Sequence, residues 1–111
     1  MIFWITGKAK SGKTTLAYRM AKQIKGIVLD GDDVRKYFPE EYDSMSIYRH
    51  LERITNFALI LENQGFNVII SCISPDRSIR KYFQRKFESC IEICLPFGTM
   101  WEGTKYEYPK D

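Results

Sequence analysis

The sequence predicts a three-layer α/β/α domain with a mostly parallel sheet of about four strands. Short apolar runs alternate along the chain with stretches that keep a helical apolar period, which is typical of strands joined by helical crossovers. The apolar runs are continuous, as expected for strands that are covered on both faces. The length of 111 residues, 44% of them hydrophobic, suits a single domain over residues 1–111.

Four short apolar runs are the predicted strands. They are IFWIT, IVL, NVIIS and CIEICL, at residues 2–6, 27–29, 67–71 and 90–95. The last run carries Glu92, and a charged residue in such a run indicates a wet face or an edge of the sheet. An edge strand at 90–95 makes a homodimer a plausible assembly.

Three stretches with helical periodicity separate these strands. Their apolar residues are Leu16, Met20 and Ile24; Ile47, Leu51, Ile54, Ala58 and Leu61; and Ile79, Phe83 and Phe87. Gly26 and Gly65 follow the first two stretches, where glycine commonly ends a helix. The sequence SPD precedes the third, with Ser74 as the expected N-cap. The polar stretch 30–46 predicts a loop with a short helical piece.

Charge and cysteine content narrow the class of protein. The formal net charge is +3, which suits anionic small ligands, and no block of like charges indicates a nucleic-acid partner. Basic residues are densest at 77–86, where we predict a solvated helix face. No apolar run approaches the roughly 18 residues of a membrane span. With three cysteines, no CxxC pair and no signal peptide, we expect a cytoplasmic protein without a membrane partner.

The segment GKAKSGKT, residues 7–14, matches the phosphate-loop pattern G-x-x-x-x-G-K-[ST] between a predicted strand and a predicted helix. Its glycines let the backbone turn so that amide groups face phosphate oxygens, and the helix adds its positive end. A lysine suits the outer phosphates, and a threonine hydroxyl suits Mg²⁺. The chain is therefore predicted to have a P-loop NTPase-type fold that binds a nucleoside triphosphate with Mg²⁺. The motif alone does not distinguish a hydrolase, a switch protein and a small-molecule kinase. The expected phosphate-binding residues are Gly7, Lys10, Ser11, Gly12, Lys13, Thr14 and Thr15.

A second polar segment, VLDGDDVR, follows the second predicted strand. It brings Asp30, Asp32 and Arg35 to the carboxyl edge of the sheet, where ligands lie in open α/β folds. No acidic residue ends the third predicted strand. Asp30 or Asp32 is therefore the candidate to assist Mg²⁺ and to orient an acceptor hydroxyl.

The segments GKAKSGKTTLA, LDGDDVR and ISCISPDRSIR resemble, in order and rough spacing, those of the adenylylsulfate kinases. The resemblance covers residues 2–95. It implies a kinase that uses MgATP to phosphorylate the 3′-hydroxyl of adenosine 5′-phosphosulfate, a small-molecule substrate. It implies that Asp32 is the catalytic carboxylate, with Asp30 in support. From the chemistry of the phosphate loop and the nearby carboxylates, Lys13 is the further catalytic candidate, and Thr14 with Asp32 is the expected metal site. The implied substrate-binding residues are Arg35, Arg49, Ser74 and Arg77.

The sequence departs from the family at several places. Arg49 matches a substrate arginine only with a shifted alignment, and the family's following asparagine has no clean counterpart. His50, the sole histidine, is expected to be structural. Beyond Leu95 the family continues with a basic lid, a fifth strand and a final helix, so the resemblance implies a short form without them. The aromatic residues Trp101, Tyr106 and Tyr108 are expected to cap the core, or else to stack on a base.

Two alternatives stay open at this point. The first is a P-loop kinase that acts on another sugar, nucleoside or polynucleotide hydroxyl. The second is a reduced nucleotide-binding module with little catalysis.

Overall fold

A computed structural model describes residues 1–110, which form four strands and four helices. Strands and helices alternate along most of this length, with α2 and α3 following one another. The elements are β1 (Ile2–Gly7), α1 (Lys13–Ile24), β2 (Ile27–Asp30), α2 (Gly31–Tyr37), α3 (Ser44–Asn63), β3 (Val68–Ser71), α4 (Arg77–Gln84) and β4 (Cys90–Leu95).

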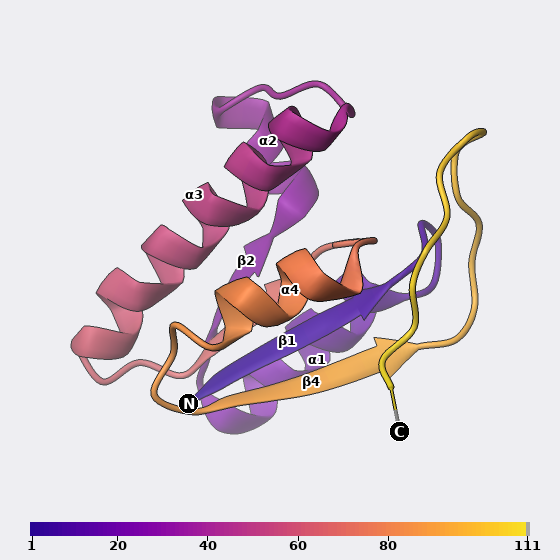
Figure 1. Ribbon diagram of the computed structural model, residues 1–111. Helices are drawn as coiled ribbons and strands as arrows, with labels where there is room; N and C mark the ends of the chain where they lie inside the picture. The colour runs from indigo at the N-terminus through magenta and orange to yellow at the C-terminus, as the bar shows by residue number, and fades with distance from the viewer. Residues whose placement is uncertain (111) are drawn as a thin grey trace.

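The sheet has the order β2-β3-β1-β4, and all its neighbouring strands are parallel. Helix α1 covers one face, and α3 and α4 cover the other (Figure 1). This arrangement confirms the predicted α/β/α class with a parallel sheet. β4 lies at an edge, as Glu92 indicated. A homodimer through that edge stays a prediction.

The hydrophobic core is divided by the sheet. Trp4 and Ile70 belong to the larger cluster between the sheet and helices α3 and α4, whereas Ile5 and Ile69 pack on the α1 side. All four side chains are fully buried. Neighbouring residues of one strand therefore enter opposite layers, which is why β1 and β3 have continuous apolar sequences.

Helix α3 is the longest element, with 20 residues. Its inner side, including Leu51, Ile54 and Ala58, is buried against the sheet. Within residues 1–110, no helix combines the length and the apolar character needed to cross a membrane.

The start and end of α4 differ from the prediction. Asp76, not Ser74, is the N-cap, because its side chain accepts a hydrogen bond from the backbone N–H of Ile79 at 3.0 Å. Ser74 lies two residues earlier and is buried. Phe87 was predicted to continue the helix, but α4 ends at Gln84. Phe87 still packs in the core, which explains why it extended the apolar pattern.

Helix α1 ends close to the predicted Gly26, but for a different reason. The left-handed residue is Lys25, with φ of 54° and ψ of 48°, and its N–H donates to the carbonyl of Ala21. A Cβ at Gly26 would lie 2.5 Å from a methyl group of Ile69. Close packing therefore favours glycine at position 26, because a larger residue would displace the end of the Ile69 side chain, whereas Lys25 has the left-handed backbone.

We expect the substitution Lys25→Gly to stabilise the protein by about 0.5–1 kcal/mol, because glycine adopts the left-handed conformation without steric cost. Lys25 is exposed, so little packing is lost. The matched change Lys22→Gly, at an exposed position inside α1, should instead destabilise by about 1 kcal/mol. Urea denaturation of both variants tests the contrast; destabilisation by Lys25→Gly would contradict it.

Candidate active site

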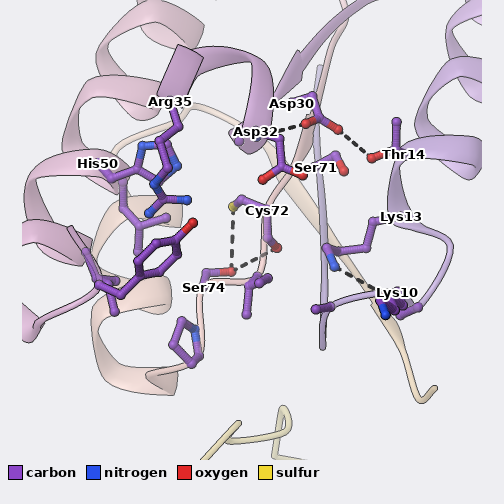
Figure 2. A pocket seen from close by; sticks show the side chains of 18 of the residues that line it. Lys10, Lys13, Thr14, Asp30, Asp32, Arg35, His50, Ser71, Cys72 and Ser74 are labelled. Atoms are coloured by element: carbon purple, nitrogen blue, oxygen red, sulfur yellow. Dashed lines mark hydrogen bonds between the residues drawn. The ribbon is translucent and has the colours of Figure 1, made fainter. Parts of the chain in front are cut away.

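A cavity of about 720 Å³ opens at the carboxyl ends of the strands. It is lined by the loop after β1, the junction of β2 and α2, the first turns of α3, and the segment that follows β3 (Figure 2). This is the edge of a parallel sheet where ligands bind in open α/β folds.

The loop between β1 and α1 has the backbone of a phosphate-binding loop. Gly12 has φ of 96° and Lys10 has φ of 60°, both in the left-handed region. A Cβ at Gly7 would lie 2.7 Å from the carbonyl oxygen of Leu95, so a side chain there is excluded. Among residues 1–110, no side chain caps α1, which leaves its first amide groups available to an anion.

Lys13, the first residue of α1, is folded back onto this loop. Its Nζ donates to the carbonyl oxygen of Lys8 at 2.6 Å and to Oγ of Ser11 at 3.3 Å. Burial lowers the pKa of Lys13, and the nearby Asp30 and Asp32 partly oppose that effect. The ammonium group of Lys13 is thus held beside the phosphate loop, where it can contact a phosphate bound by that loop.

Asp30 is the carboxylate that joins the phosphate loop to the rest of the cavity. It is 6% exposed, and its Oδ2 accepts a hydrogen bond from the Thr14 hydroxyl at 2.6 Å. Its Oδ1 accepts from the backbone N–H of Asp32 at 2.9 Å, which caps α2. This cap explains why the short helix predicted within residues 30–46 begins directly after β2. Asp32 itself is exposed and lines the cavity.

The hydroxyl of Thr14 and the carboxylates of Asp30 and Asp32 are hard oxygen groups of the kind that Mg²⁺ prefers. Asp30 is the carboxylate in contact with Thr14, and the predicted metal site at Thr14 and Asp32 stays a prediction. Within the described residues, no group of three or more His, Cys, Asp or Glu side chains forms a complete metal site. The oxygen groups of Thr14, Asp30 and Asp32 fit Mg²⁺ that is held in part by phosphate oxygens, which is a common way of binding this ion.

Two of the four predicted substrate-binding residues, Arg35 and Ser74, line the cavity opposite the phosphate loop. The guanidinium of Arg35 lies 4.3 Å from the ring centroid of Tyr42, and its Nε donates to the carbonyl of Glu40 at 3.3 Å. The Ser74 hydroxyl accepts a hydrogen bond from the indole N–H of Trp4 at 3.1 Å. Arg35 thus supplies a positive charge at this wall, and the hydrogen bond from Trp4 holds the Ser74 side chain in place.

Arg49 and Arg77 are not among the residues that line the cavity. Arg49 pairs with the carboxylate of Glu40 at 3.2 Å. Arg77 donates from its Nη1 to the carbonyl of Tyr108 at 2.8 Å. The structure therefore brings Arg35 and Ser74 together with the phosphate loop and engages the other two arginines elsewhere.

Sequence reasoning missed three residues of the cavity wall. His50 lines the cavity although it is only 4% exposed, and its Nδ1 has no partner among the described residues. Tyr42 and Trp101 also line it, with ring centroids 5.4 Å apart. Trp101 was expected to cap the core or else to stack on a base, and Tyr42 gave no sequence signal. Tyr106 is buried, as expected of a residue that caps the core.

The geometry defines a class of protein before any comparison is made. A phosphate loop between a buried strand and a helix, facing carboxylates at the end of another strand of the same parallel sheet, is typical of P-loop proteins that bind nucleoside triphosphates. The chain belongs to the adenylylsulphate kinase family, whose family model matches residues 1–102.

Two curated relatives illustrate the family. A probable adenylyl-sulfate kinase of Archaeoglobus fulgidus is 32% identical over 99 residues, which are 83% of this chain and 64% of that protein. A cytidine diphosphoramidate kinase of Campylobacter jejuni is 33% identical over 100 residues, 85% of this chain and 59% of that protein. The chain thus spans less than two thirds of the length of these relatives.

Solved structures agree with the fold. An APS kinase of Mycobacterium tuberculosis matches with a TM-score of 0.82 at 26% identity, over 99% of this chain and 80% of that chain. The same protein in complex with AMPPNP and APS matches with a TM-score of 0.88 at 19% identity, over 99% and 83%.

We expect His50 to make folding stability fall in acid. Burial, followed by the charges of Arg35 and Arg53, lowers the pKa of His50 from 6.5 to about 4. Between those pH values the unfolded chain binds a proton that the folded chain does not. The contribution of His50 to the free energy of unfolding should therefore be fully present above pH 6.5. As the pH falls to 4, the free energy of unfolding should decrease by up to about 3 kcal/mol.

Urea denaturation of the wild type and of His50→Gln between pH 4 and pH 7 measures this loss. Other titrating groups are shared by the two proteins, so the difference between their pH profiles isolates His50. Parallel profiles would contradict the assignment.

Proposed function

We propose that the chain is an ATP-dependent phosphotransferase of the adenylylsulfate kinase type, with adenosine 5′-phosphosulfate as its acceptor and the 3′-hydroxyl as the accepting group. One observation carries the proposal. A single cavity contains the phosphate loop on one side and Asp32, Arg35 and Ser74 on the other. A donor phosphate and an acceptor hydroxyl bound there would meet without a large movement of the chain.

The phosphate loop would bind the ATP phosphates through its amide groups, the N-terminus of α1 and Lys13. Lys13 is bonded to its own loop through Lys8 and Ser11. A β- or γ-phosphate oxygen would replace these contacts with a charge-assisted hydrogen bond, which is stronger than a bond to a neutral carbonyl.

Thr14 and the neighbouring carboxylates, Asp30 and Asp32, would hold Mg²⁺ together with the ATP phosphates. Bound there, the ion supplies positive charge against the charge that develops on the transferred group. Asp30 is already fixed by two hydrogen bonds, one from Thr14 and one from the backbone of Asp32. Its orientation is therefore set before any ligand binds.

Asp32 is the side chain that we assign to the acceptor hydroxyl. It is exposed within the cavity and has no side-chain partner among the described contacts, whereas Asp30 is buried and engaged. Asp32 would orient the hydroxyl and take its proton as the hydroxyl oxygen forms a bond to the γ-phosphorus. The bond between the γ-phosphorus and the bridging oxygen breaks, and ADP leaves.

The wall around Arg35 suits a nucleotide acceptor. Arg35 provides a planar cation that pairs with phosphate or sulfate oxygens. Tyr42 and Trp101 offer aromatic faces on which a base can stack. The relatives support this reading, since the Archaeoglobus protein is named as a probable adenylyl-sulfate kinase and the Mycobacterium enzyme was solved with APS.

A second candidate is the same transfer to a different hydroxyl. Arg35 is the one arginine among the described cavity residues, because Arg49 and Arg77 are engaged elsewhere. A single arginine is a modest clamp for an acceptor that carries both phosphate and sulfate charge. The Campylobacter relative is named for another acceptor, cytidine diphosphoramidate.

We expect Asp32→Asn to lower kcat for phosphate transfer by about 100-fold or more, because the amide cannot accept the hydroxyl proton. The KM for ATP should change little. Asp33→Asn is the matched control, since Asp33 is the next residue of α2 but does not line the cavity. Initial rates with MgATP test the pair; an Asp32→Asn enzyme as active as the control would remove Asp32 from the mechanism.

A panel of acceptors tests the substrate. With MgATP, we expect adenosine 5′-phosphosulfate to be phosphorylated with the highest kcat/KM among adenosine 5′-phosphosulfate, cytidine diphosphoramidate, free nucleosides, sugars and 5′-hydroxyl oligonucleotides. A higher value for another hydroxyl would favour the second candidate. Nucleotide binding in a calorimeter without any product would instead indicate a binding module.

A further inference from the structure

We propose that Arg80 is a positioning residue for the acceptor side of the cavity, because its buried guanidinium joins Ser74 of the cavity wall to the segment 104–108. The effect on catalysis rests on the proposed function, but the structural link does not. Sequence analysis predicted a solvated helix face for the basic stretch that contains Arg80. Its side chain is instead fully buried.

Each side of the Arg80 guanidinium has a partner. Its Nη1 donates to the carbonyl oxygen of Ser74 at 2.6 Å, and its Nη2 donates to the carbonyl oxygen of Glu107 at 2.7 Å. Its Nε donates to the carboxylate of Glu92 at 3.1 Å, which supplies the counter-charge. The guanidinium also lies 5.2 Å from the ring centroid of Tyr106. One side chain therefore connects α4, β4, the cavity wall and the segment 104–108.

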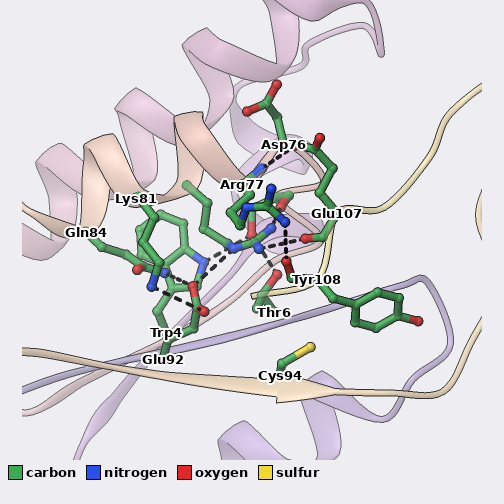
Figure 3. Close-up of polar contacts among 12 residues, drawn as sticks. Trp4, Thr6, Asp76, Arg77, Lys81, Gln84, Glu92, Cys94, Glu107 and Tyr108 are labelled. Atoms are coloured by element: carbon green, nitrogen blue, oxygen red, sulfur yellow. Dashed lines mark hydrogen bonds and ion pairs between the residues drawn. The ribbon is translucent and has the colours of Figure 1, made fainter. Parts of the chain in front are cut away.

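The surroundings keep this buried cation in one orientation. Glu92 also accepts from Gln84 at 2.6 Å and from Lys81 at 3.4 Å. Figure 3 shows Lys81, Gln84 and Glu92 on one side of the network and Glu107 and Tyr108 on the other. A buried charge is tolerated when it is paired and hydrogen-bonded in this way. The planar guanidinium of Arg80 donates hydrogen bonds in three fixed directions. A lysine ammonium on its flexible side chain does not reproduce that geometry.

Ser74 is the point where this network meets the cavity. Its backbone has φ of 43°, a left-handed conformation that costs about 1 kcal/mol or more for a non-glycine residue and persists only when neighbours enforce it. Arg80 holds its carbonyl, while Trp4 and Thr6 contact its hydroxyl at 3.1 and 3.0 Å. Thr6 in turn contacts the hydroxyl of Tyr106 at 2.7 Å. The carbonyl of Ser74 is thus linked to the segment 104–108 through Arg80, and its hydroxyl is linked to that segment through Thr6.

These contacts imply that Arg80 sets the position of Ser74, and through it the shape of the acceptor side. The phosphate loop has no direct contact with Arg80 among the described hydrogen bonds. Weakening the link should therefore affect acceptor binding while ATP binding is preserved.

The test compares Arg80→Lys with Lys81→Gln. The two residues are neighbours on α4 and share the partner Glu92, but only Arg80 contacts Ser74. The first readout needs no activity. The indole N–H of Trp4 bonds to Ser74, and the protein has two tryptophans, so a Trp101→Phe variant assigns its NMR resonance. We expect the Trp4 indole resonance to move in Arg80→Lys and to stay in place in Lys81→Gln.

The second readout is kinetic. In Arg80→Lys we expect the KM for the acceptor to rise by about tenfold, with the KM for ATP within about twofold of wild type. Lys81→Gln should leave both values unchanged. Equal increases in both KM values, or equal effects of the two variants, would overturn the proposal, because general destabilisation would account for them.

If Arg80→Lys does not fold, Tyr106→Phe provides the second variant. It removes only the hydroxyl that contacts Thr6 and should move the Trp4 resonance away from its wild-type position. An unchanged Trp4 resonance in that variant would contradict the link. A wild-type protein that transfers phosphate to no acceptor would defeat the proposed function alone, since the resonance comparison would still decide the role of Arg80.

Discussion

The site depends on one carboxylate, that of Asp30. One of its oxygens caps α2, and the other accepts a hydrogen bond from the hydroxyl of Thr14 in the first turn of α1. Strands β2 and β1 are not neighbours, because β3 lies between them. The hydrogen bond between Thr14 and Asp30 therefore crosses the end of β3. It joins the phosphate loop to the side of the cavity that contains Arg35. The carboxylate that connects the two sides of the cavity thus comes from the end of β2. The strand between, β3, ends in Ser71 and supplies no carboxylate there.

The cavity is supported from both ends of its wall by buried polar groups. Asp30 fixes the side nearest the phosphate loop, and Arg80 reaches the opposite side through the carbonyl of Ser74. Both groups are almost completely buried, and both are fully engaged with fixed partners. Between them, Asp32 and Arg35 remain exposed or partly exposed to the cavity. Rigid buried charges thus position the side chains that are free to meet ligands.

Local sequence patterns predicted what depends on local physics. The strands were recognisable because residues such as Trp4 and Ile5 enter opposite core layers, and the phosphate loop because its glycines are required by backbone geometry. Ser74 was mistaken for an N-cap because Asp76 is an equally good cap two residues later. The burial of Arg80 and the cavity positions of His50 and Trp101 depend on segments distant in sequence, which no local pattern records.

The strand order also affects how the chain folds. β1 occupies a central position, and its two neighbours, β3 and β4, are both made from much later parts of the sequence. During synthesis, β1 emerges before β3 and β4, so the phosphate loop that follows β1 cannot be fixed until those later strands are made. Closing such long loops is entropically costly and slow, and it leaves an apolar β1 unpaired in the nascent chain.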